Sequence, residues 1–392
     1  MAYERIPSLD DSIVTAGERI AIEIITGYLN RSHANGEFPM RTAPVSALEL
    51  GLYTDSRFGA ANVKWAQAIE HTRETLFANY LERGIMPVVS GFDGIHHESG
   101  DFQEGVQRRK TQSRNRVPNK VFRTSLGRGG SDLTAAFLGV ALEAEYVGFC
   151  KETPGVLTGD DLVAGSDAKT VPVLSYELAT EAGNIYSKAV EPVRAARIPI
   201  HIFDPTRPEY QTVVSECDLP DGFYLIDRPK ESVNIHLGSI PDEPGKLIEY
   251  LQLFAGQNVN VEEIRHQHSG TDLIVCGRDS DIEECLAHFH ERGLEALAHY
   301  TWYIRVIGNI SGEMAAQFNL VIRPYMPLSL AAYQWKTKVV TATVARNRTL
   351  SNEIEFERIR EVFQVLHNDL VVPTTDGIAA NVEERVDLGG MS

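Results

Sequence analysis

The chain has few cysteines and no long apolar run, and both shortages limit what it can be. Its four cysteines, Cys150, Cys217, Cys276 and Cys285, lie far apart in 392 residues and form no CxxC pair. This spacing argues against a zinc site or a disulfide framework, so we predict a reduced, cytoplasmic protein without a metal site of its own. No apolar stretch approaches the roughly 18 residues that cross a bilayer, and no signal-peptide pattern opens the sequence.

Positive charge is also scarce. Lys and Arg number 37 against 54 Asp and Glu, which gives a formal net charge of −17. Such a charge repels phosphodiester backbones and anionic lipid, so neither nucleic acid nor a membrane is expected as a partner. The length and the 43% hydrophobic content allow two or three domains, each with its own core.

The first half alternates amphipathic and apolar segments. We predict helices over residues 17–28, 60–84, 131–144 and 177–197, and strands over 85–94, 145–150 and 198–203. Ser12 and Thr15 are candidate caps of the first helix. Helices that alternate with buried strands and glycine turns are typical of a mostly parallel sheet. The pattern predicts a layered α/β domain over residues 1–225.

The second half has a different pattern. Residues 232–300 predict a βαββα unit, and residues 301–373 repeat it more weakly. Two tandem small α+β units behind a larger domain suggest a regulatory appendage. Residues 374–392 are acidic, lack periodicity and are expected to be disordered.

A basic linker precedes the most unusual motif. Within residues 95–123 it gathers Arg108, Arg109, Lys110, Arg114, Arg116, Lys120 and Arg123. A solvated hairpin is the favoured interpretation because charged loops usually lie in solvent. A lid over phosphates is the alternative.

The motif itself, TSLGRGGSDLT, covers residues 124–134. Glycines before a helix leave backbone N–H groups accessible, and the helix adds the positive end of its dipole, so an anion is expected there. Glycine loops also serve simply as turns. Arg128 and Asp132 favour the binding interpretation, because a guanidinium and a carboxylate are poor choices for a purely structural turn.

These motifs resemble a known family. TSLGRGGSD, TAGER (15–19), DSRFG (55–59) and PVVSGFDG (87–94) are similar to segments of the aspartate kinases of the amino-acid kinase superfamily. DEPGKLIEYLQLFAGQNVNV (242–261) resembles the first of their tandem ACT regulatory domains. The resemblance runs from about Asp11 to Val372. It implies an α/β amino-acid-kinase-type sheet followed by two ACT domains.

The resemblance also implies roles for individual residues. Arg128 would hold the α-carboxylate of L-aspartate, Glu18 its ammonium group, and Phe92 would lie against it. The implied nucleotide contacts are Gly129, Gly130, Ser131 and Lys188, and Asp132 would position charged groups at the transfer site. Taken alone, Glu18 could equally be a first-turn glutamate favoured by the helix dipole, and Lys188 a solvated helix lysine.

The chain departs from the family in two places. Aspartate kinases begin with a strand that carries KFGG, and no KFGG occurs in these 392 residues. The resemblance therefore implies a sheet that is incomplete at its N-terminus, by about 30 residues or more. On the nucleotide side, Lys151 and Glu152 stand where the family usually has a Thr-Asp pair, and Leu157 replaces a tyrosine.

The first small unit carries the implied effector site, which comprises Ser239, Asp242, Gly245, Asn260, Val261 and Glu262. A tight turn and a helix cap are the plain alternative for these residues. The second unit has NISGEMAA in place of the D-x-P-G turn and is expected to take part in a homodimer. The implied effector is lysine or threonine.

Three functions follow from the resemblance. The first is phosphorylation of the β-carboxylate of L-aspartate by ATP with Mg²⁺, where catalysis needs alignment and charge neutralisation. The second is a catalytically silent regulatory homologue that binds amino acids and pairs with a complete kinase subunit. The third is a kinase for another amino-acid carboxylate.

Overall fold

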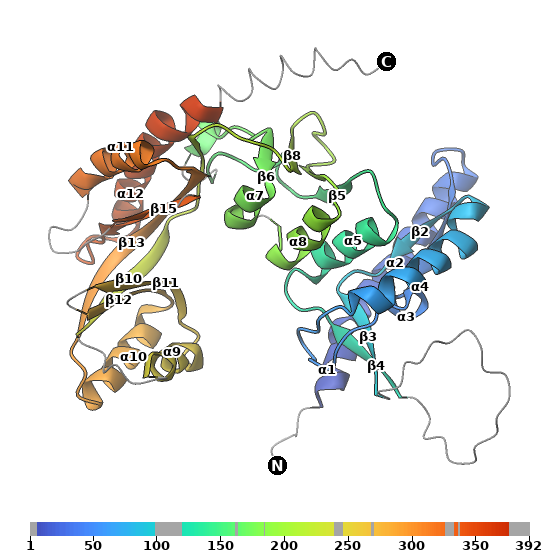
Figure 1. Cartoon of the computed structure of the whole chain (residues 1–392), viewed down its shortest axis with the longest axis horizontal. Coiled ribbons are helices and arrows are strands. Elements are labelled where there is room, and N and C mark those ends of the chain that lie inside the picture. Colours follow the sequence, from blue (N-terminus) through green and yellow to red (C-terminus); the bar gives the residue numbers. More distant parts are fainter. Residues whose placement is uncertain are drawn as a thin grey trace. The chain divides into compact units, whose positions relative to one another are not determined.

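The computed structural model describes residues 6–98, 120–160, 164–183, 185–238, 246–267, 270–325, 333–335 and 338–375. The chain forms two compact units (Figure 1). The first unit comprises Met1–Cys150, Gly183–Ile202 and Val213–Glu216, and the second comprises Lys151–Ala182, Phe203–Thr212 and Cys217–Ser392. Residues 99–119 of the basic linker predicted as a hairpin lie outside the described residues, and so does the tail after residue 375.

The first unit is an α/β assembly. Its elements are α1 (Pro7–Val14), α2 (Ala16–Ala34), β1 (Arg41–Val45), α3 (Ala47–Leu50), α4 (Trp65–Asn79), β2 (Ile85–Val89), β3 (Asp93–His97), β4 (Val121–Ser125), α5 (Gly130–Ala141), β5 (Val147–Cys150), α8 (Ser187–Ala195), β7 (Ile200–Phe203) and β8 (Gln211–Ser215). β1 and β2 pair in parallel, whereas β3 and β4 form an antiparallel pair in which Asp93 lies opposite Ser125. The first unit therefore combines a parallel strand pair with an antiparallel one.

The core of this unit lies beneath the glycine loop. Helix α5 packs beside α8 (Figure 1) and also against α4. Phe137 on α5 is fully buried and meets Trp65 of α4 edge to face, with ring centroids 5.5 Å apart. The other buried members of this core are Val45, Ala47, Leu50, Leu52, Ala68, Leu76, Tyr80, Leu126 and Leu133. Burial of these apolar side chains anchors the start of α5 on the unit.

Two local predictions were wrong. Residues 7–14 form the helix α1, so Ser12 lies inside a helix, where its hydroxyl donates to the carbonyl of Ser8, and does not cap the next one. The helix expected over residues 177–197 is interrupted and forms α7 (Tyr176–Ala182) and α8. The break follows Gly183, whose φ of 67° is left-handed and ends α-helical geometry.

The second unit contains a seven-stranded sheet with the order β11-β12-β10-β13-β15-β14, and β9 pairs with β13. Its elements are β6 (Val173–Ser175), α7, β9 (Gly222–Ile226), β10 (Lys230–Leu237), α9 (Lys246–Gly256), β11 (Asn260–Gln267), β12 (Gly270–Cys276), α10 (Asp279–Glu291), β13 (Ala296–Asn309), α11 (Gly312–Ile322), β14 (Tyr333–Trp335), β15 (Val339–Ala345) and α12 (Asn352–Leu366). The order of helices and strands predicted for both small units is confirmed.

One long strand joins the two small units. The first part of β13 pairs with β10, and its second part pairs with β15 and β9. Each half of the sheet has its own helices and core (Figure 1): Phe254 of α9 and Phe289 of α10 on one half, Phe318 of α11 and Phe363 of α12 on the other. The boundary predicted near residue 300 therefore falls inside a continuous strand.

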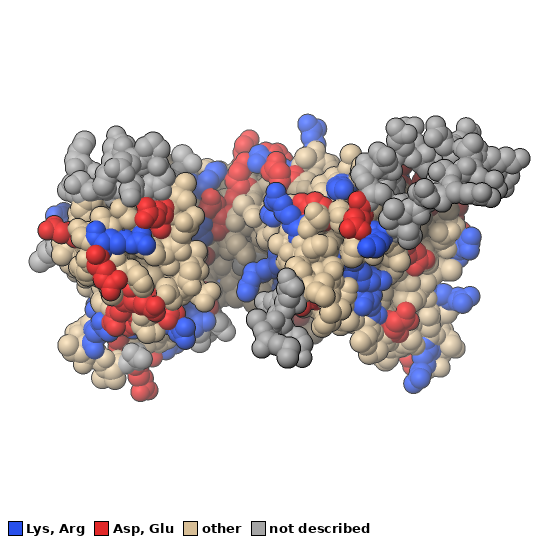
Figure 2. Space-filling model, turned by 90° about the horizontal axis from the view of Figure 1, so that it is seen from below, with Lys and Arg blue, Asp and Glu red and all other residues tan. Residues whose placement is uncertain are grey.

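Charged residues are mixed on the surface. Figure 2 shows Lys and Arg interspersed with Asp and Glu on the face it displays. Among the described residues, none of the helices combines the length and the apolar character that crossing a membrane requires.

Burial makes one histidine a source of pH dependence in the second unit. His367 is fully buried, its Nε2 lies 2.8 Å from Thr158 Oγ1, and burial lowers its pKa. A depressed histidine pKa stabilises the fold above the unfolded value of about 6.5 and loses that contribution as pH falls through the folded value.

We therefore expect the wild type to lose unfolding free energy relative to His367→Gln as pH falls from 7.5 to 5.5. Glutamine keeps a polar group near Thr158 but does not titrate in this range. Urea unfolding of both proteins at the two pH values measures the difference. A difference that stays constant would show that His367 does not titrate with folding.

Candidate active site

The glycine loop links the end of β4 to the start of α5. Gly127 and Gly129 have φ values of 75° and 76°, a left-handed geometry that only glycine adopts without strain. The amide of Gly130 donates to the carbonyl of Gly127 at 2.9 Å and closes the turn. Gly129 is the N-cap residue of α5, and no side chain caps this helix. The amides of its first turn can therefore serve an anion.

Phe92 packs directly on this loop. Its backbone is left-handed, with φ 66°, and its carbonyl accepts a hydrogen bond from the amide of Leu126 at 3.0 Å. Its own amide donates to Thr134 Oγ1 at 3.2 Å. A Cβ at Gly130 would lie 2.8 Å from Phe92 Cδ2, so the ring fills the space that Gly130 leaves open. A non-glycine residue held at positive φ is often found at a functional site.

Ser131 and Asp132 begin α5. The side chain of Ser131 is exposed, and its Oγ lies 3.1 Å from the position that a Cβ on Gly91 would take. Asp132 Oδ2 accepts a hydrogen bond from the amide of Tyr186 at 3.3 Å. The ring of Tyr186 fills the space beside Gly129. The rings of Tyr186 and Phe92 thus occupy the space beside Gly129 and Gly130. An anion would therefore approach the amides of the first turn of α5 and not the Cα atoms of these glycines.

The two predicted cations at the site are exposed. Arg128 lies in the loop between Gly127 and Gly129, and Lys188 lies in the first turn of α8. Lys188 Nζ donates weakly to Asn62 Oδ1 at 3.5 Å. Asn62 is itself held by Asp55, to which its Nδ2 donates at 2.8 Å. Both cations are available to a ligand in solvent.

Glu18 lies half-exposed in the first turn of α2. The described part of the glycine loop makes no hydrogen bond to it. The next residue, Arg19, interacts electrostatically with Asp93, which directly follows Phe92. The first turn of α2 is therefore associated with the GFDG turn, but Glu18 itself makes no hydrogen bond or ion pair with the described loop.

Sequence reasoning missed two buried carboxylates here. Asp11 of α1 is 3% exposed, and its Oδ2 accepts from the amides of Ser125 at 2.8 Å and Gly59 at 2.9 Å. One carboxylate thus joins α1, the end of β4 and the DSRFG loop. The glycine loop after β4 and the DSRFG loop were both identified as motifs from the sequence. For Asp11, the sequence indicated only that it lies shortly before the TAGER segment.

Asp93 is the second missed group. It is fully buried, and Oδ2 pairs with Arg123 Nη1 at 2.7 Å, while the other oxygen has no partner among the described residues. Burial raises the pKa of Asp93 to about 6, although Arg123 and Arg19 oppose the shift. The carboxyl group fastens β3 to β4 immediately before the loop.

The implied cofactor can be tested against these residues. An uncapped helix start and an exposed Lys188 suit the phosphates of a nucleotide. Within the described ranges no group of three His, Cys, Asp or Glu side chains could hold a metal ion.

The predicted effector residues are only partly described. Ser239, Asp242 and Gly245 lie outside the described residues. Asn260 begins β11, and its Nδ2 donates to Glu262 Oε1 at 2.7 Å. Lys230 Nζ lies 2.8 Å from Glu262 Oε2, and the register of β11 shifts between Val261 and Glu263. The structure thus brings Asn260 and Glu262 together beside an irregularity in the strand.

The sequence matches known proteins. The model of the Amino acid kinase family matches residues 3–204. The chain is 30% identical over 201 residues to aspartokinase 1 of Bacillus subtilis, which covers 50% of this chain and 41% of that protein. It is 28% identical over 322 residues to chloroplastic aspartokinase 3 of Arabidopsis thaliana, which covers 76% of this chain and 52% of that protein. The chain spans about half the length of these curated relatives.

The fold also matches solved structures. Aspartokinase III of Escherichia coli, solved in complex with lysine and aspartate, superposes with a TM-score of 0.67 at 20% identity and covers 94% of this chain and 77% of that one. Aspartate kinase of Clostridium acetobutylicum gives a TM-score of 0.65 at 14% identity, over 92% of this chain and 75% of that one. At such identities the likeness establishes the fold, and the predicted fold class is confirmed.

The packing of Phe92 on Gly130 can be tested by substitution. Gly130→Ala should cost about 1–3 kcal/mol of unfolding free energy, because the added methyl group collides with the Phe92 ring and the Leu126 side chain. Gly27→Ala on α2 is the matched control, since nothing lies within 4 Å of its Cβ position. It should stabilise the protein slightly through helix propensity. Chemical unfolding measures both, and equal effects would contradict the proposed packing.

Asp93 gives a pH-dependent prediction. A carboxyl whose folded pKa is raised stabilises the fold below its unfolded pKa of about 3.9, and this contribution is lost as pH rises through the folded value of about 6. The wild type should therefore lose about 2 kcal/mol relative to Asp93→Asn between pH 4 and pH 7. Unfolding titrations at several pH values measure this. A loss in the opposite direction would mean that Arg123 dominates over burial.

Proposed function

Because the chain belongs to the amino acid kinase family, we propose that it is an aspartate kinase, which transfers the γ-phosphoryl group of ATP to the β-carboxylate of L-aspartate. The observation that supports this most is the folded GRGGSD segment. It places an exposed guanidinium, an uncapped helix start and the Phe92 ring around one turn. The aspartokinases to which the chain is similar support the choice of aspartate as acceptor.

In this proposal each residue has a limited task. Arg128 binds the α-carboxylate of aspartate through a charge-assisted hydrogen bond, and Phe92 limits the space for its side chain. Glu18 receives the ammonium group. The amides around Ser131 and the ammonium of Lys188 take the phosphates, and Asp132, held by the amide of Tyr186, orients the charged groups.

The transfer itself asks for little covalent chemistry. The attacking oxygen of aspartate and the γ-phosphorus must be aligned, and the charge that develops must be neutralised. ATP and Mg²⁺ supply the phosphoryl group and part of that neutralisation. The residues of this chain bind, orient and neutralise.

Regulation belongs to the second unit in this proposal. An amino acid, lysine or threonine, would bind near Asn260, Val261 and Glu262, together with Ser239, Asp242 and Gly245, and the small units would mediate a homodimer in the cytoplasm. A lysine complex of the Escherichia coli enzyme supports the choice of an amino-acid effector. The small domains proposed are residues 232–300 and 301–373, behind a catalytic domain of residues 1–225.

The alternative is amino-acid binding without phosphoryl transfer. It is favoured by Lys151 and Glu152, which stand where the family usually has a Thr-Asp pair on the nucleotide side. Hydroxylamine trapping of aspartyl phosphate, with ATP, Mg²⁺ and L-aspartate, separates the two functions. Turnover supports the kinase, and aspartate binding without turnover supports the alternative.

The role of Arg128 is tested by Arg128→Ala. Removing a charge-assisted partner should weaken aspartate binding by roughly 10- to 100-fold and leave ATP binding unchanged. Arg83→Ala, which removes another exposed arginine of the first unit, is the control and should have no effect. Calorimetric titration with aspartate and with ATP measures both affinities. Unchanged aspartate affinity in Arg128→Ala would rule out this assignment.

A further inference from the structure

A hollow of about 630 Å³ lies in the second unit, and none of the predicted effector residues lines it. It is lined by Ala298, His299, Tyr300, Thr301, Ala345, Arg346, Asn347, Arg348 and Arg358. These residues come from β13, from the end of β15 with the turn that follows it, and from α12. The volume falls within the usual range for small-molecule sites.

One wall of the hollow is an open strand edge. Pairing between β13 and β15 ends at Thr301 opposite Ala345. The carbonyl of Tyr300 still accepts a hydrogen bond from the amide of Arg346 at 3.0 Å, so the backbone of Tyr300 faces the β15 side. Backbone groups of a strand alternate with a period of two, so the amide and carbonyl of Ala298 face the same side. There β15 has ended, and no described strand pairs with them.

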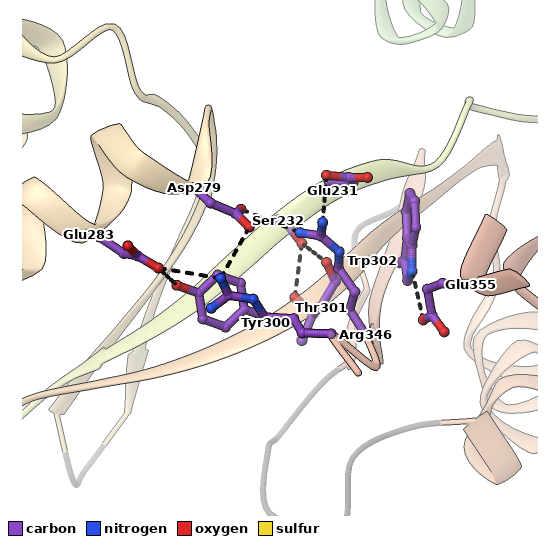
Figure 3. Close-up of polar contacts among 10 residues, drawn as sticks. Glu231, Ser232, Asp279, Glu283, Tyr300, Thr301, Trp302, Arg346 and Glu355 are labelled. Carbon is purple, nitrogen blue, oxygen red and sulfur yellow. Dashed lines mark hydrogen bonds and ion pairs between the residues drawn. The ribbon is translucent and has the colours of Figure 1, made fainter. Parts of the chain in front are cut away.

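The opposite wall carries arginines that carboxylates hold in place (Figure 3). Arg346 Nη2 lies 2.9 Å from Glu231, and its Nη1 lies 3.4 Å from Asp279. Arg348 stacks on Tyr300, with its Cζ 3.9 Å from the ring centroid, and makes longer ion pairs of 3.4 Å to Glu283 and 3.7 Å to Asp279. The side chain of Arg346 is only 10% exposed, whereas that of Arg348 is 46% exposed.

Glu355, which does not itself line the hollow, holds two of the residues that do, Asn347 and Arg358. Its carboxylate accepts hydrogen bonds from Trp302 Nε1 at 3.2 Å (Figure 3), from the amide of Asn347 at 3.1 Å and from Arg358 Nε at 3.0 Å. Burial alone would raise the pKa of Glu355, but these hydrogen bonds lower it. Arg358 is thereby held in an ion pair with Glu355. Among the three arginines, Arg348 makes the longer ion pairs and so retains N–H donors for a ligand.

The charges select the kind of ligand. Three arginines, Arg346, Arg348 and Arg358, line the hollow, and four carboxylates outside its lining, Glu231, Asp279, Glu283 and Glu355, pair with them, so the group carries a formal excess of one negative charge. A purely anionic ligand would be repelled by this excess. A ligand that brings an ammonium together with a carboxylate is accommodated, because the ammonium can bind the carbonyl of Ala298 and the carboxylate can bind Arg348.

We propose that this hollow binds a free α-amino acid, with its carboxylate on Arg348 and its ammonium on the open edge of β13 at Ala298. This site is separate from the effector residues around Asn260 and Glu262. It does not require kinase activity.

Calorimetric titration of the full chain with glycine and L-alanine tests the proposal. Arg348→Gln should weaken amino-acid binding at least tenfold, because the ligand carboxylate loses its charged partner. The affinity of Arg348→Lys should lie between those of the wild type and Arg348→Gln. Arg292→Gln is the matched control: Arg292 pairs with Glu249 on the same unit, at 2.8 Å and with similar exposure, but does not line the hollow. Its binding should equal that of the wild type.

Further probes separate this site from the others. Acetate and methylammonium, which each carry one of the two charges, should bind at least tenfold more weakly than glycine. Asn260→Ala should leave the Arg348-dependent binding intact. Glycine binding with unchanged affinity and unchanged stoichiometry in Arg348→Gln, or no saturable glycine binding to the wild type, would overturn the proposal. Tighter binding of a short peptide with a free carboxyl end would overturn the choice of a free amino acid.

A loss of fold in Arg348→Gln would itself remove binding, so circular dichroism accompanies each titration. If that variant does not fold, Arg348→Lys, which keeps the positive charge, carries the test. Wild-type affinity for glycine in Arg348→Lys would then contradict a role for the guanidinium.

Discussion

The tight turn of the chain at the glycine loop is the constraint on which the arrangement of the first unit depends. β4 must end, reverse and enter α5 within five residues, and this requires left-handed backbone at Gly127 and Gly129. The turn brings the bare backbone of Gly130 against Phe92, and that contact in turn holds Phe92 at a positive φ. The carboxylate of Asp11 binds the amide of Ser125 just before the turn, so the loop is fixed at both ends.

The second unit depends on a different device, the shared strand β13. Because one strand supplies hydrogen bonds to β10 in its first part and to β15 in its second, the two small units cannot separate without breaking a continuous ladder. The same continuity explains the hollow. β15 covers only part of β13, and where it stops, arginines from the following turn stand beside an edge that no described strand occupies.

The sequence predicted the order of elements well, because periodicity and glycine turns depend on nearby residues. It also identified the glycine loop, since Arg128 and Asp132 stand within the motif itself. It did not predict α1, Asp11 or the Asp93–Arg123 pair, because these depend on contacts between residues far apart in the chain, such as Asp11 with Ser125. The split of the helix over residues 177–197 was missed because apolar spacing continues across Gly183.

The two sites differ in how their arginines are employed, and this difference separates the ligands they can take. Arg128 is exposed, and the described part of the chain offers it no carboxylate within ion-pair distance, so it can supply a full positive charge to an anionic group. Arg346 and Arg348 already form ion pairs with carboxylates, so they can bind a ligand anion only if the ligand also brings a positive charge. In a protein of net charge −17, unpaired and paired arginines thus discriminate between a phosphate or carboxylate at one site and a zwitterion at the other.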